Sequence, residues 1–508
     1  MTFASVVYAT CFGWTGLAAV LYAIDIKLRV RVSRNADFVA FQRKYFIGYL
    51  PCLFADSLQA PYLYYLYQSY GFLEYQIAVL YVFGLCSGLM CSLFGWLMNY
   101  RLGPRLQTLI MIAIGSSGCL LKLFPYYGVL LISRILDGIA ASLLSSAPAA
   151  WYWHHHIRSL ELPPSWLTVT ARSTAVAAGW LAVSAGFIAQ YSEDATMITP
   201  IPYIIAGALL LVGGAWIGGL WEEISQSPQP GAATAAEAGF GISGAGYNQD
   251  PSASGTARVG LVTQGSQVGR PSVWRVYRRA FRTLASQPIL GLLAAVQALF
   301  EGVLGVFVFL WTPLFMVLRP SIGGRPPLGV IYSSFMASAL AGALMYRLLS
   351  RRHISAWNLL PISIGASFLA LAGAVALMYP NATPSVSVSR YELLLFFLCI
   401  YEAGVGAYFP AIERLQRELL GREDRPTLLG LFRAPITILA CGGLLMLHDK
   451  DRVWGNWLLL AMSLVALLLA LLTAILLSTI GKSAPSVVDL PLRLDSTGDD
   501  EDDEDGDF

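Results

Sequence analysis

The chain has 508 residues, of which 56% are hydrophobic and only 13% are charged. A soluble domain carries about a quarter charged residues, so this composition excludes an ordinary soluble protein and indicates that lipid surrounds much of the chain. The net charge of +2 says little by itself, and we expect no nucleic-acid partner. The seven cysteines lie in apolar runs without the spacing of a metal site, and we expect no cofactor.

Thirteen segments are long and apolar enough to cross a bilayer, which takes about 20 residues. They are 3–26, 45–67, 75–99, 106–123, 127–150, 166–190, 200–221, 287–312, 328–349, 356–379, 391–411, 427–447 and 454–481. Basic residues follow the first segment and none precede it, which favours an uncleaved anchor with the N-terminus outside. We expect Asp25 to lie at the interface, at the end of this anchor.

The distribution of basic residues predicts the orientation of the chain. With the loop 27–44 in the cytoplasm, most of the 33 Lys and Arg residues fall in cytoplasmic segments, whereas few, Lys122 among them, fall outside. The positive-inside rule therefore predicts an outer N-terminus and a cytoplasmic C-terminus. Nothing in the sequence is an organelle address, so the plasma membrane is the default expectation.

The order of the segments is one helix, then six, a long loop, and six more. This plan is typical of the major facilitator fold, in which two related bundles surround a central cavity. We predict an all-α polytopic membrane protein of that fold, with 6+6 transmembrane helices in two pseudo-symmetric bundles and an extra N-terminal transmembrane helix. The predicted units are 1–44 (extra helix and basic loop), 45–221 (N-terminal bundle), 222–286 (largely disordered cytoplasmic linker), 287–481 (C-terminal bundle) and 482–508 (acidic disordered tail). Within the linker, 274–284 is a basic amphipathic stretch that we expect at the cytoplasmic interface.

Two pairs of segments repeat a pattern at the positions that this pseudo-symmetry requires. An acid is followed six and eight residues later by aromatics in both halves: Asp56 with Tyr62 and Tyr64, and Glu301 with Phe307 and Phe309. Arginine also stands about two turns from the cytoplasmic end of the sixth and twelfth segments, as Arg172 and Arg433.

At these residues the chain resembles the molybdate-anion transporter family of the major facilitator superfamily. The blocks that carry the resemblance are "EYQIAVLYVFGL" (74–85), "DSLQAPYLYYLY" (56–67), "LFEGVLGVFVFLWTP" (299–313), "GAYFPAIERL" (406–415) and "LFRAPITILACGGLLMLHD" (431–449). The resemblance implies a secondary transporter that takes up molybdate by alternating access. Sulfate, an organic carboxylate, or a role as a non-transporting sensor or scaffold are the alternatives. No motif of a membrane enzyme is present in the sequence.

One loop departs from the pattern of the superfamily. The loop between the second and third core helices usually resembles G-x3-D-R-x-G-R-R, and here it is "GWLMNYRLGPR" (95–105). Asn99 or Tyr100 stands where the acid belongs. We predict a gating role for Arg101, Gly103 and Arg105 in this loop, and for Arg172, which structural pairing near the gate explains equally well.

Charged side chains inside membrane spans cost at least about 2.5–3.5 kcal/mol each, so they persist when paired or when they line a wet pathway. Asp56 lies near the middle of its span, with Gln59 on the same face, and Pro61 leaves the carbonyl of Ser57 free. Glu301 lies at a similar depth, and we expect it to face Asp56 across a hydrated central cavity between the two bundles. The sequence leaves three explanations open: a substrate or proton path, a structural ion pair with an intramembrane arginine, or misplaced span edges.

The basic residues within the spans favour an oxyanion substrate. We find three intramembrane arginines and no lysine in the middle of any span, and the planar fork of arginine suits oxyanions. Arg134 is one of these arginines, and the alternative to contact with the substrate is that Asp137, three residues later, simply neutralises it. We hypothesise that Asp56 or Glu301 carries a proton that is coupled to the anion. The histidines 154–156 cannot all face one metal ion, and we interpret them as interfacial anchors. The predicted substrate-contacting residues are Asp56, Gln59, Tyr62, Arg134, Gln297, Glu301, Glu402 and Arg433.

Overall fold

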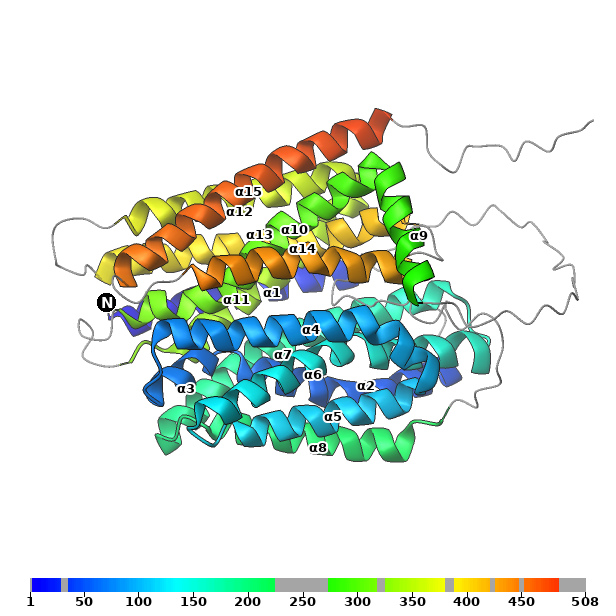
Figure 1. Cartoon of the computed structure of the whole chain (residues 1–508), viewed down its shortest axis with the longest axis horizontal. Coiled ribbons are helices and arrows are strands. Elements are labelled where there is room, and N and C mark those ends of the chain that lie inside the picture. Colours follow the sequence, from blue (N-terminus) through cyan, green and yellow to red (C-terminus); the bar gives the residue numbers. More distant parts are fainter. Residues whose placement is uncertain are drawn as a thin grey trace, which may run out of the picture.

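The protein is described by a computed structural model. It covers residues 2–28, 35–223, 273–317, 325–379, 388–420, 425–446 and 452–483. Most of the predicted linker and tail, and the side chain of Arg101, lie outside the described residues. Figure 1 shows two groups of roughly parallel helices, one from each half of the chain.

The N-terminal group is built from α2 to α8, and the C-terminal group from α10 to α15. The first group contains α2 (Ala36–Gln59), α3 (Leu63–Ser69), α4 (Glu74–Arg101), α5 (Pro104–Leu121), α6 (Tyr127–His154), the π-helical turn η1 (His155–Ser159), α7 (Ser165–Thr196) and α8 (Ile201–Leu220). The second contains α10 (Pro288–Met316), α11 (Leu328–Arg351), α12 (Ala356–Leu377), α13 (Val388–Leu419), α14 (Arg425–Leu445) and α15 (Arg452–Ser483). The remaining helices are α1 (Phe3–Lys27) and α9 (Val273–Ser286).

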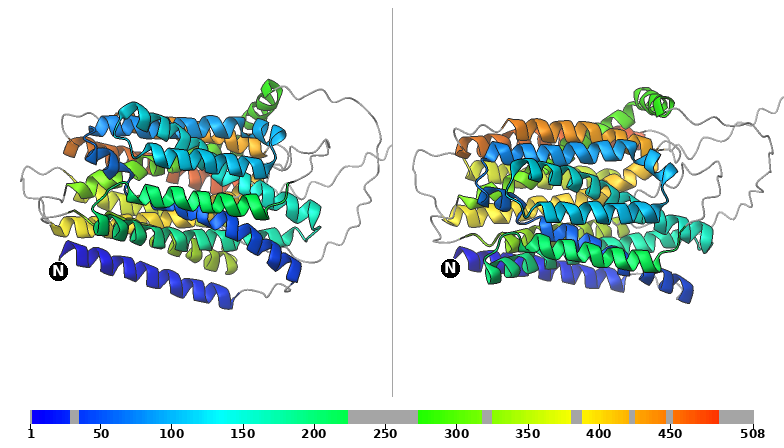
Figure 2. Two further views of the ribbon diagram at one scale, coloured as in Figure 1. Left: turned by 90° about the horizontal axis from the view of Figure 1, so that it is seen from below. Right: turned by 60° about the horizontal axis from the view of Figure 1, so that its bottom comes forward.

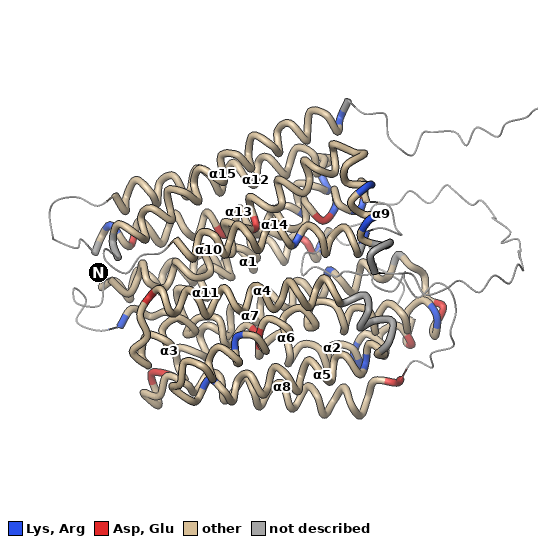
Figure 3. The backbone as a smooth tube through the Cα atoms, viewed as in Figure 1, with Lys and Arg blue, Asp and Glu red and all other residues tan. Residues whose placement is uncertain are grey.

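Twelve of the described helices are long and apolar enough to cross a membrane. The predicted segment 45–67 is absent from these twelve, because the structure divides it between α2 and α3 and α2 carries four charged residues. Together α2 and α3 complete six spans in the N-terminal group. Figure 3 shows that Lys, Arg, Asp and Glu gather toward the two ends of the helices, with few in between. The polytopic all-α prediction is confirmed.

The second predicted segment is interrupted where proline was expected to bend it. Helix α2 ends at Gln59, a turn covers residues 60–62, and α3 begins at Leu63. Pro61 has no N–H with which to continue the helical hydrogen bonds. The carbonyl of Gln59, the last residue of α2, accepts a hydrogen bond of 3.2 Å from the Tyr203 hydroxyl, so the break is stabilised from α8.

The pseudo-symmetric aromatics of the two halves meet each other. Tyr64 and Phe309 each stand eight residues after the matching acid, and their rings contact edge to face at 5.3 Å between centroids. Both side chains are buried. Equivalent positions that touch across two repeats must lie near the axis that relates the repeats, so this contact supports the internal symmetry predicted from the sequence.

Helix α1 packs outside the two groups, against α11 and α13, and Figure 2 shows it along one edge of the molecule. Its cluster of Ala18 and Leu21 also contains Val176 of α7, so α1 covers the line where the two groups meet. Asp25 is fully buried and forms a 2.8 Å ion pair with Arg351 of α11. A partner on another helix therefore neutralises Asp25, and its depth relative to the membrane interface stays a prediction.

The two groups contact each other along two seams, α7 with α11 and α4 with α14. In the first seam a Cβ on Gly186 would lie closer than 3.0 Å to the Gly329 carbonyl oxygen and to Ser333 Oγ. Only glycine allows the helices this approach. In the second seam Arg433 of α14 donates a hydrogen bond to Ser92 Oγ of α4.

Helix α9 corresponds to the predicted amphipathic stretch and lies crosswise to the other helices in Figure 1. Ala280 is buried, whereas the next residue, Phe281, is 56% exposed. The Tyr277 hydroxyl donates to the Leu93 carbonyl of α4, while α9 itself contacts α10 and α14. Helix α9 therefore bridges both groups at one end of the molecule, which we call the α9 end. The opposite end, where α1 begins, is the α1-start end.

Candidate functional site

A cavity of about 480 Å³ lies between the two groups of helices. Side chains from both halves line it, including Asp56 and Gln59 of α2, Arg134 of α6, Tyr332 of α11 and Glu402 of α13. A cavity at the interface of two repeats, with polar side chains from discontinuous helices, is where transporters of this architecture bind their substrates. We therefore treat this central cavity as the candidate site.

Three charged side chains at the cavity are in contact and form a triad: Lys122, Asp137 and Arg134. Lys122 Nζ lies 2.7 Å from Asp137 Oδ1, and Arg134 Nη1 lies 3.2 Å from Asp137 Oδ2. Lys122 also donates a 3.0 Å hydrogen bond to Gln59 Oε1. The lysine is 0% exposed, so its charge is held in a low-dielectric environment where electrostatic interactions are strong.

Small and aromatic residues make room for the triad. A Cβ on Gly118 would lie 2.8 Å from Asp137 Oδ1, and one on Gly84 would lie 2.8 Å from Arg134 Nη2. The guanidinium of Arg134 lies 5.0 Å from the centroid of the Tyr81 ring, close enough for a cation–π interaction. Local sequence therefore positions the triad: glycines leave room for the Asp137 carboxylate and the Arg134 guanidinium, and the Tyr81 ring packs against that guanidinium.

Two carboxyl groups face the cavity without a partner of their own. Among the described residues, neither Asp56 nor Glu402 has a hydrogen bond or ion pair, although Glu402 is only 5% exposed. Tyr332 lies near both, since its hydroxyl interacts electrostatically with each carboxyl and is within hydrogen-bonding reach of Ser57. One carboxyl group therefore comes from each half of the molecule.

Arg134 and Glu402 occupy matching places in the two repeats. Arg134 stands four residues before Gly138 on α6, and Glu402 stands four residues before Gly406 on α13. Each of these glycines marks a close helix crossing, α6 with α4 and α13 with α11, where a Cβ would lie closer than 3.0 Å to a carbonyl oxygen of the neighbouring helix. The pseudo-symmetry thus places a cation on one wall and a carboxyl group on the other.

Three of the predicted residues form a second cluster, which does not line the central cavity. Glu301 accepts a 3.3 Å hydrogen bond from the Tyr408 hydroxyl and has Gln297 within hydrogen-bonding reach. Gln416 donates a 2.8 Å hydrogen bond to Gln297 Oε1. Arg433 lies close enough to attract Glu301 electrostatically. The expectation that Asp56 and Glu301 face each other was therefore wrong, because Glu402 shares the cavity with Asp56.

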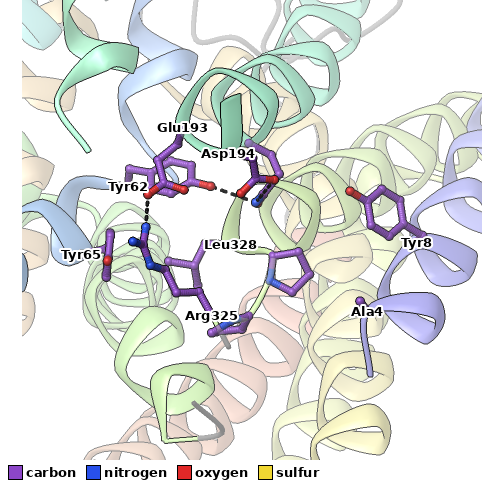
Figure 4. Close-up of a pocket in the computed structure, with 11 residues that line it drawn as sticks. Ala4, Tyr8, Tyr62, Tyr65, Glu193, Asp194, Arg325 and Leu328 are labelled. Carbon is purple, nitrogen blue, oxygen red and sulfur yellow. Dashed lines mark hydrogen bonds and ion pairs between the residues drawn. The ribbon is translucent and has the colours of Figure 1, made fainter. Parts of the chain in front are cut away.

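Tyr62 contributes to a different, smaller pocket of about 220 Å³ at the α1-start end. Its hydroxyl donates a 3.0 Å hydrogen bond to Gln190 Oε1 of α7, and the same oxygen accepts a 3.0 Å bond from the Gly329 N–H of α11. Glu193 of α7 pairs with Arg325, just before α11, as Figure 4 shows. These contacts join the two halves, so the molecule is closed at this end.

The predicted gating residues lie within the N-terminal group. Gly103 is the N-cap residue of α5. Arg105 bonds to Glu223 at 3.1 Å and to the Gly218 carbonyl at 2.7 Å, which ties the start of α5 to the end of α8. Arg172 is half-buried on α7, and the side chain of Arg101 lies outside the described residues.

The three consecutive histidines pack among aromatic residues at the end of α6. His155 lies on Trp151 at 4.6 Å between ring centroids, and its Nε2 is 3.3 Å from the Glu222 carbonyl oxygen. His156 is fully buried, with Nε2 3.0 Å from the Pro163 carbonyl oxygen. His154 lies at the last residue of α6 and its ring contacts Trp153. These neighbours anchor the turn that leads into α7.

Sequence reasoning missed Lys122, because the orientation count placed it in an outer segment. It is the residue that follows the last turn of α5, and its side chain reaches back to α6. Lys122 is the C-cap residue of α5 and so does not lie in the middle of a span, but its buried ammonium group nevertheless shares Asp137 with Arg134. The sequence held no signal for this contact, because Arg134 alone already balances the charge of Asp137.

Comparisons with known proteins agree with this architecture. A family model described as sugar transporters with 12 TM matches residues 7–236 and 263–398. A molybdate-anion transporter of Danio rerio is 35% identical over 91% of this chain and 91% of its own length. One from Xenopus tropicalis is 34% identical over 96% of both chains, and one from Takifugu rubripes is 33% identical over 91% of both.

The chain belongs to the molybdate-anion transporter family. Solved structures of lower identity share the major facilitator fold of this family member. A point mutant of the nucleoside transporter NupG superposes with a TM-score of 0.61 at 13% identity, over 85% of this chain and 99% of that one. A human organic anion transporter gives 0.52 at 15% identity, over 85% and 98%. At these identities the likeness establishes the fold alone.

Proposed function

We propose that this family member is a secondary transporter that takes up an oxyanion, with molybdate as the substrate, through the central cavity. The observation that carries the proposal is the Lys122–Asp137–Arg134 triad between the two halves. Molybdate is a tetrahedral dianion, so its binding requires cations and N–H donors that compensate for lost hydration. The relatives' name supports molybdate over other anions of the same shape.

Transport proceeds by alternating access, with the residues 45–221 and 287–481 as the two moving bodies. The contacts of Gln190 and Arg325 close one end, and opening that end requires α7 and α11 to part. The positive-inside rule supports an outer location for the α1-start end and a cytoplasmic location for the C-terminus. In this proposal the protein acts in the plasma membrane, and the conformation described here is closed at the outer, α1-start end.

Protons accompany the anion in this proposal. If every group is ionised, the cavity holds the two cations of the triad against three carboxylates, Asp137, Asp56 and Glu402, and repels an anion. Protonation of Asp56 and Glu402 reverses the sign of the net charge. Cys52, Tyr81 and Tyr332 are the other titratable groups that line the cavity. Protons that bind to Asp56 and Glu402 thus make the net charge of the cavity positive, which favours the binding of an anion.

Uptake of molybdate into proteoliposomes tests the transport proposal. Wild-type protein should accumulate molybdate, and Arg134→Ala and Lys122→Gln should each reduce uptake at least about tenfold, since each loses one charge-assisted contact. Arg414→Gln is the matched control, because Arg414 pairs with Glu418 on the surface of α13. Sulfate or an organic carboxylate in excess distinguishes the alternative substrates. Absence of uptake for every anion would favour a sensor or scaffold.

An imposed proton gradient tests the coupling. Wild-type uptake should accelerate when the outside is acidic, whereas Glu402→Gln and Asp56→Asn, which mimic the protonated groups, should lose much of that acceleration. Glu301→Gln serves as the comparison, because Glu301 does not line the cavity. Loss of acceleration in Glu301→Gln alone would move the proton site to the second cluster.

A further inference from the structure

Asp137 occupies the position that an anion would take between the two cations. Its two carboxylate oxygens are divided between Lys122 Nζ and Arg134 Nη1, at 2.7 and 3.2 Å. Lys122, Asp137 and Arg134 together carry a single positive charge. A dianion needs two positive charges for neutralisation, so the ionised triad alone does not match it.

The two cations have more donors than their partners use. An ammonium and a guanidinium together carry several N–H groups, and Asp137 and Gln59 accept only some of them. Arg134 Nε is buried and makes no hydrogen bond within the described residues. A buried donor without an acceptor is costly, so the spare donors mark a place for further oxygen atoms.

We propose that Asp137 is a placeholder carboxylate that sets the charge of the anion which the cavity accepts and that helps to expel it. This inference rests on the proposed function. When Asp137 leaves the cations or is neutralised, the pair Lys122 and Arg134 binds a tetrahedral dianion. When Asp137 returns, it competes for the same N–H groups and the anion is released.

The charge dependence gives a quantitative signature. Coulomb energy is proportional to the product of the two charges, so a change of site charge acts twice as strongly on a dianion as on a monoanion of the same shape. Molybdate and perrhenate are such a pair, both tetrahedral oxyanions. The logarithm of the change in apparent KM should therefore be about twice as large for molybdate as for perrhenate.

Three variants set the charge of the triad in steps. Asp137→Asn raises it by one, Lys122→Gln lowers it by one, and the double variant keeps it unchanged. Asp137→Asn should lower the KM for molybdate at least about tenfold and that for perrhenate about threefold, and it should slow turnover because release loses its competitor. Lys122→Gln should raise the KM for molybdate about tenfold and the KM for perrhenate about threefold. The double variant should keep the wild-type ratio of the two KM values.

The experiment measures uptake of both anions by proteoliposomes that contain equal amounts of folded protein, with Arg414→Gln as the control. Equal shifts for the two anions, or KM values independent of triad charge, would overturn the placeholder role while leaving anion transport intact. Absence of uptake by wild-type protein would instead overturn the proposed function. If Asp137→Asn does not fold, Lys122→Gln and the double variant still allow the changes in KM for molybdate and perrhenate to be compared.

Discussion

The closed α7–α11 seam makes a sharp prediction for Gly186→Ala. A Cβ at this position would lie closer than 3.0 Å to both the Gly329 carbonyl oxygen and Ser333 Oγ, an approach that real Cβ atoms essentially never show. One of the neighbours is backbone, so a rotamer change cannot relieve the clash. Helices α7 and α11 must therefore move apart at the α1-start end.

The magnitude follows from the cost of overpacking, which is typically about 1–3 kcal/mol. The clash exists only while the seam is closed, so the whole cost acts on the closed state. The equilibrium should shift toward the state open at the α1-start end by about 5- to 150-fold, since such free energies correspond to factors of that size. Separation also weakens the hydrogen bond between Gln190 and Gly329.

Pulsed EPR measures this shift directly. Spin labels at Thr196, the last residue of α7, and at the 52% exposed Tyr379 after α12 report the distance between the two halves at this end. Gly186→Ala should enrich the longer distance. Gly291→Ala is the matched control, because nothing lies within 4 Å of a Cβ there. An unchanged distance distribution in Gly186→Ala would refute the assignment of this seam as the closing contact.

Two further predictions concern stability in detergent. Asp25→Asn leaves Arg351 without its buried partner and should cost about 3–5 kcal/mol, seen as a lower Tm, whereas Lys27→Gln on the exposed end of α1 should not change the Tm. An unaltered Tm for Asp25→Asn would mean that the Asp25–Arg351 ion pair contributes little to stability. Gly406→Ala should lower the Tm by forcing α13 away from α11 at a cost of about 1–3 kcal/mol, and Gly442→Ala, which meets nothing within 4 Å, should not. Equal Tm values for these two alanine variants would contradict the close crossing.

Hydropathy and charge order were sufficient to predict the fold, because a bilayer forces each span to satisfy its own backbone hydrogen bonds. The position of the helix break could also be predicted, since Pro61 has no backbone N–H to donate. The repeat pattern extended further than expected: Tyr64 and Phe309, chosen as equivalent positions, contact each other directly.

The candidate site was harder to predict from the sequence, because its contacts join residues that are distant in the chain. Lys122 lies just beyond a span, and only the fold brings it to Asp137 and Gln59. Helical spacing identified Asp56 and Gln59 as neighbours but could not decide which carboxyl group of the other half faces them. That choice depends on the rotation of α10 and α13, which no single span encodes.

Helix α1 covers one of the two seams and leaves the other without an equivalent cover in the described residues. Because it packs on α11 and α13, α1 belongs mechanically to the C-terminal half and must slide along α7 whenever the halves rock. On that side α7 moves against another helix, whereas we expect the uncovered α4–α14 side to move against lipid. Bilayer fluidity and thickness should therefore influence the two sides of the rocking motion unequally.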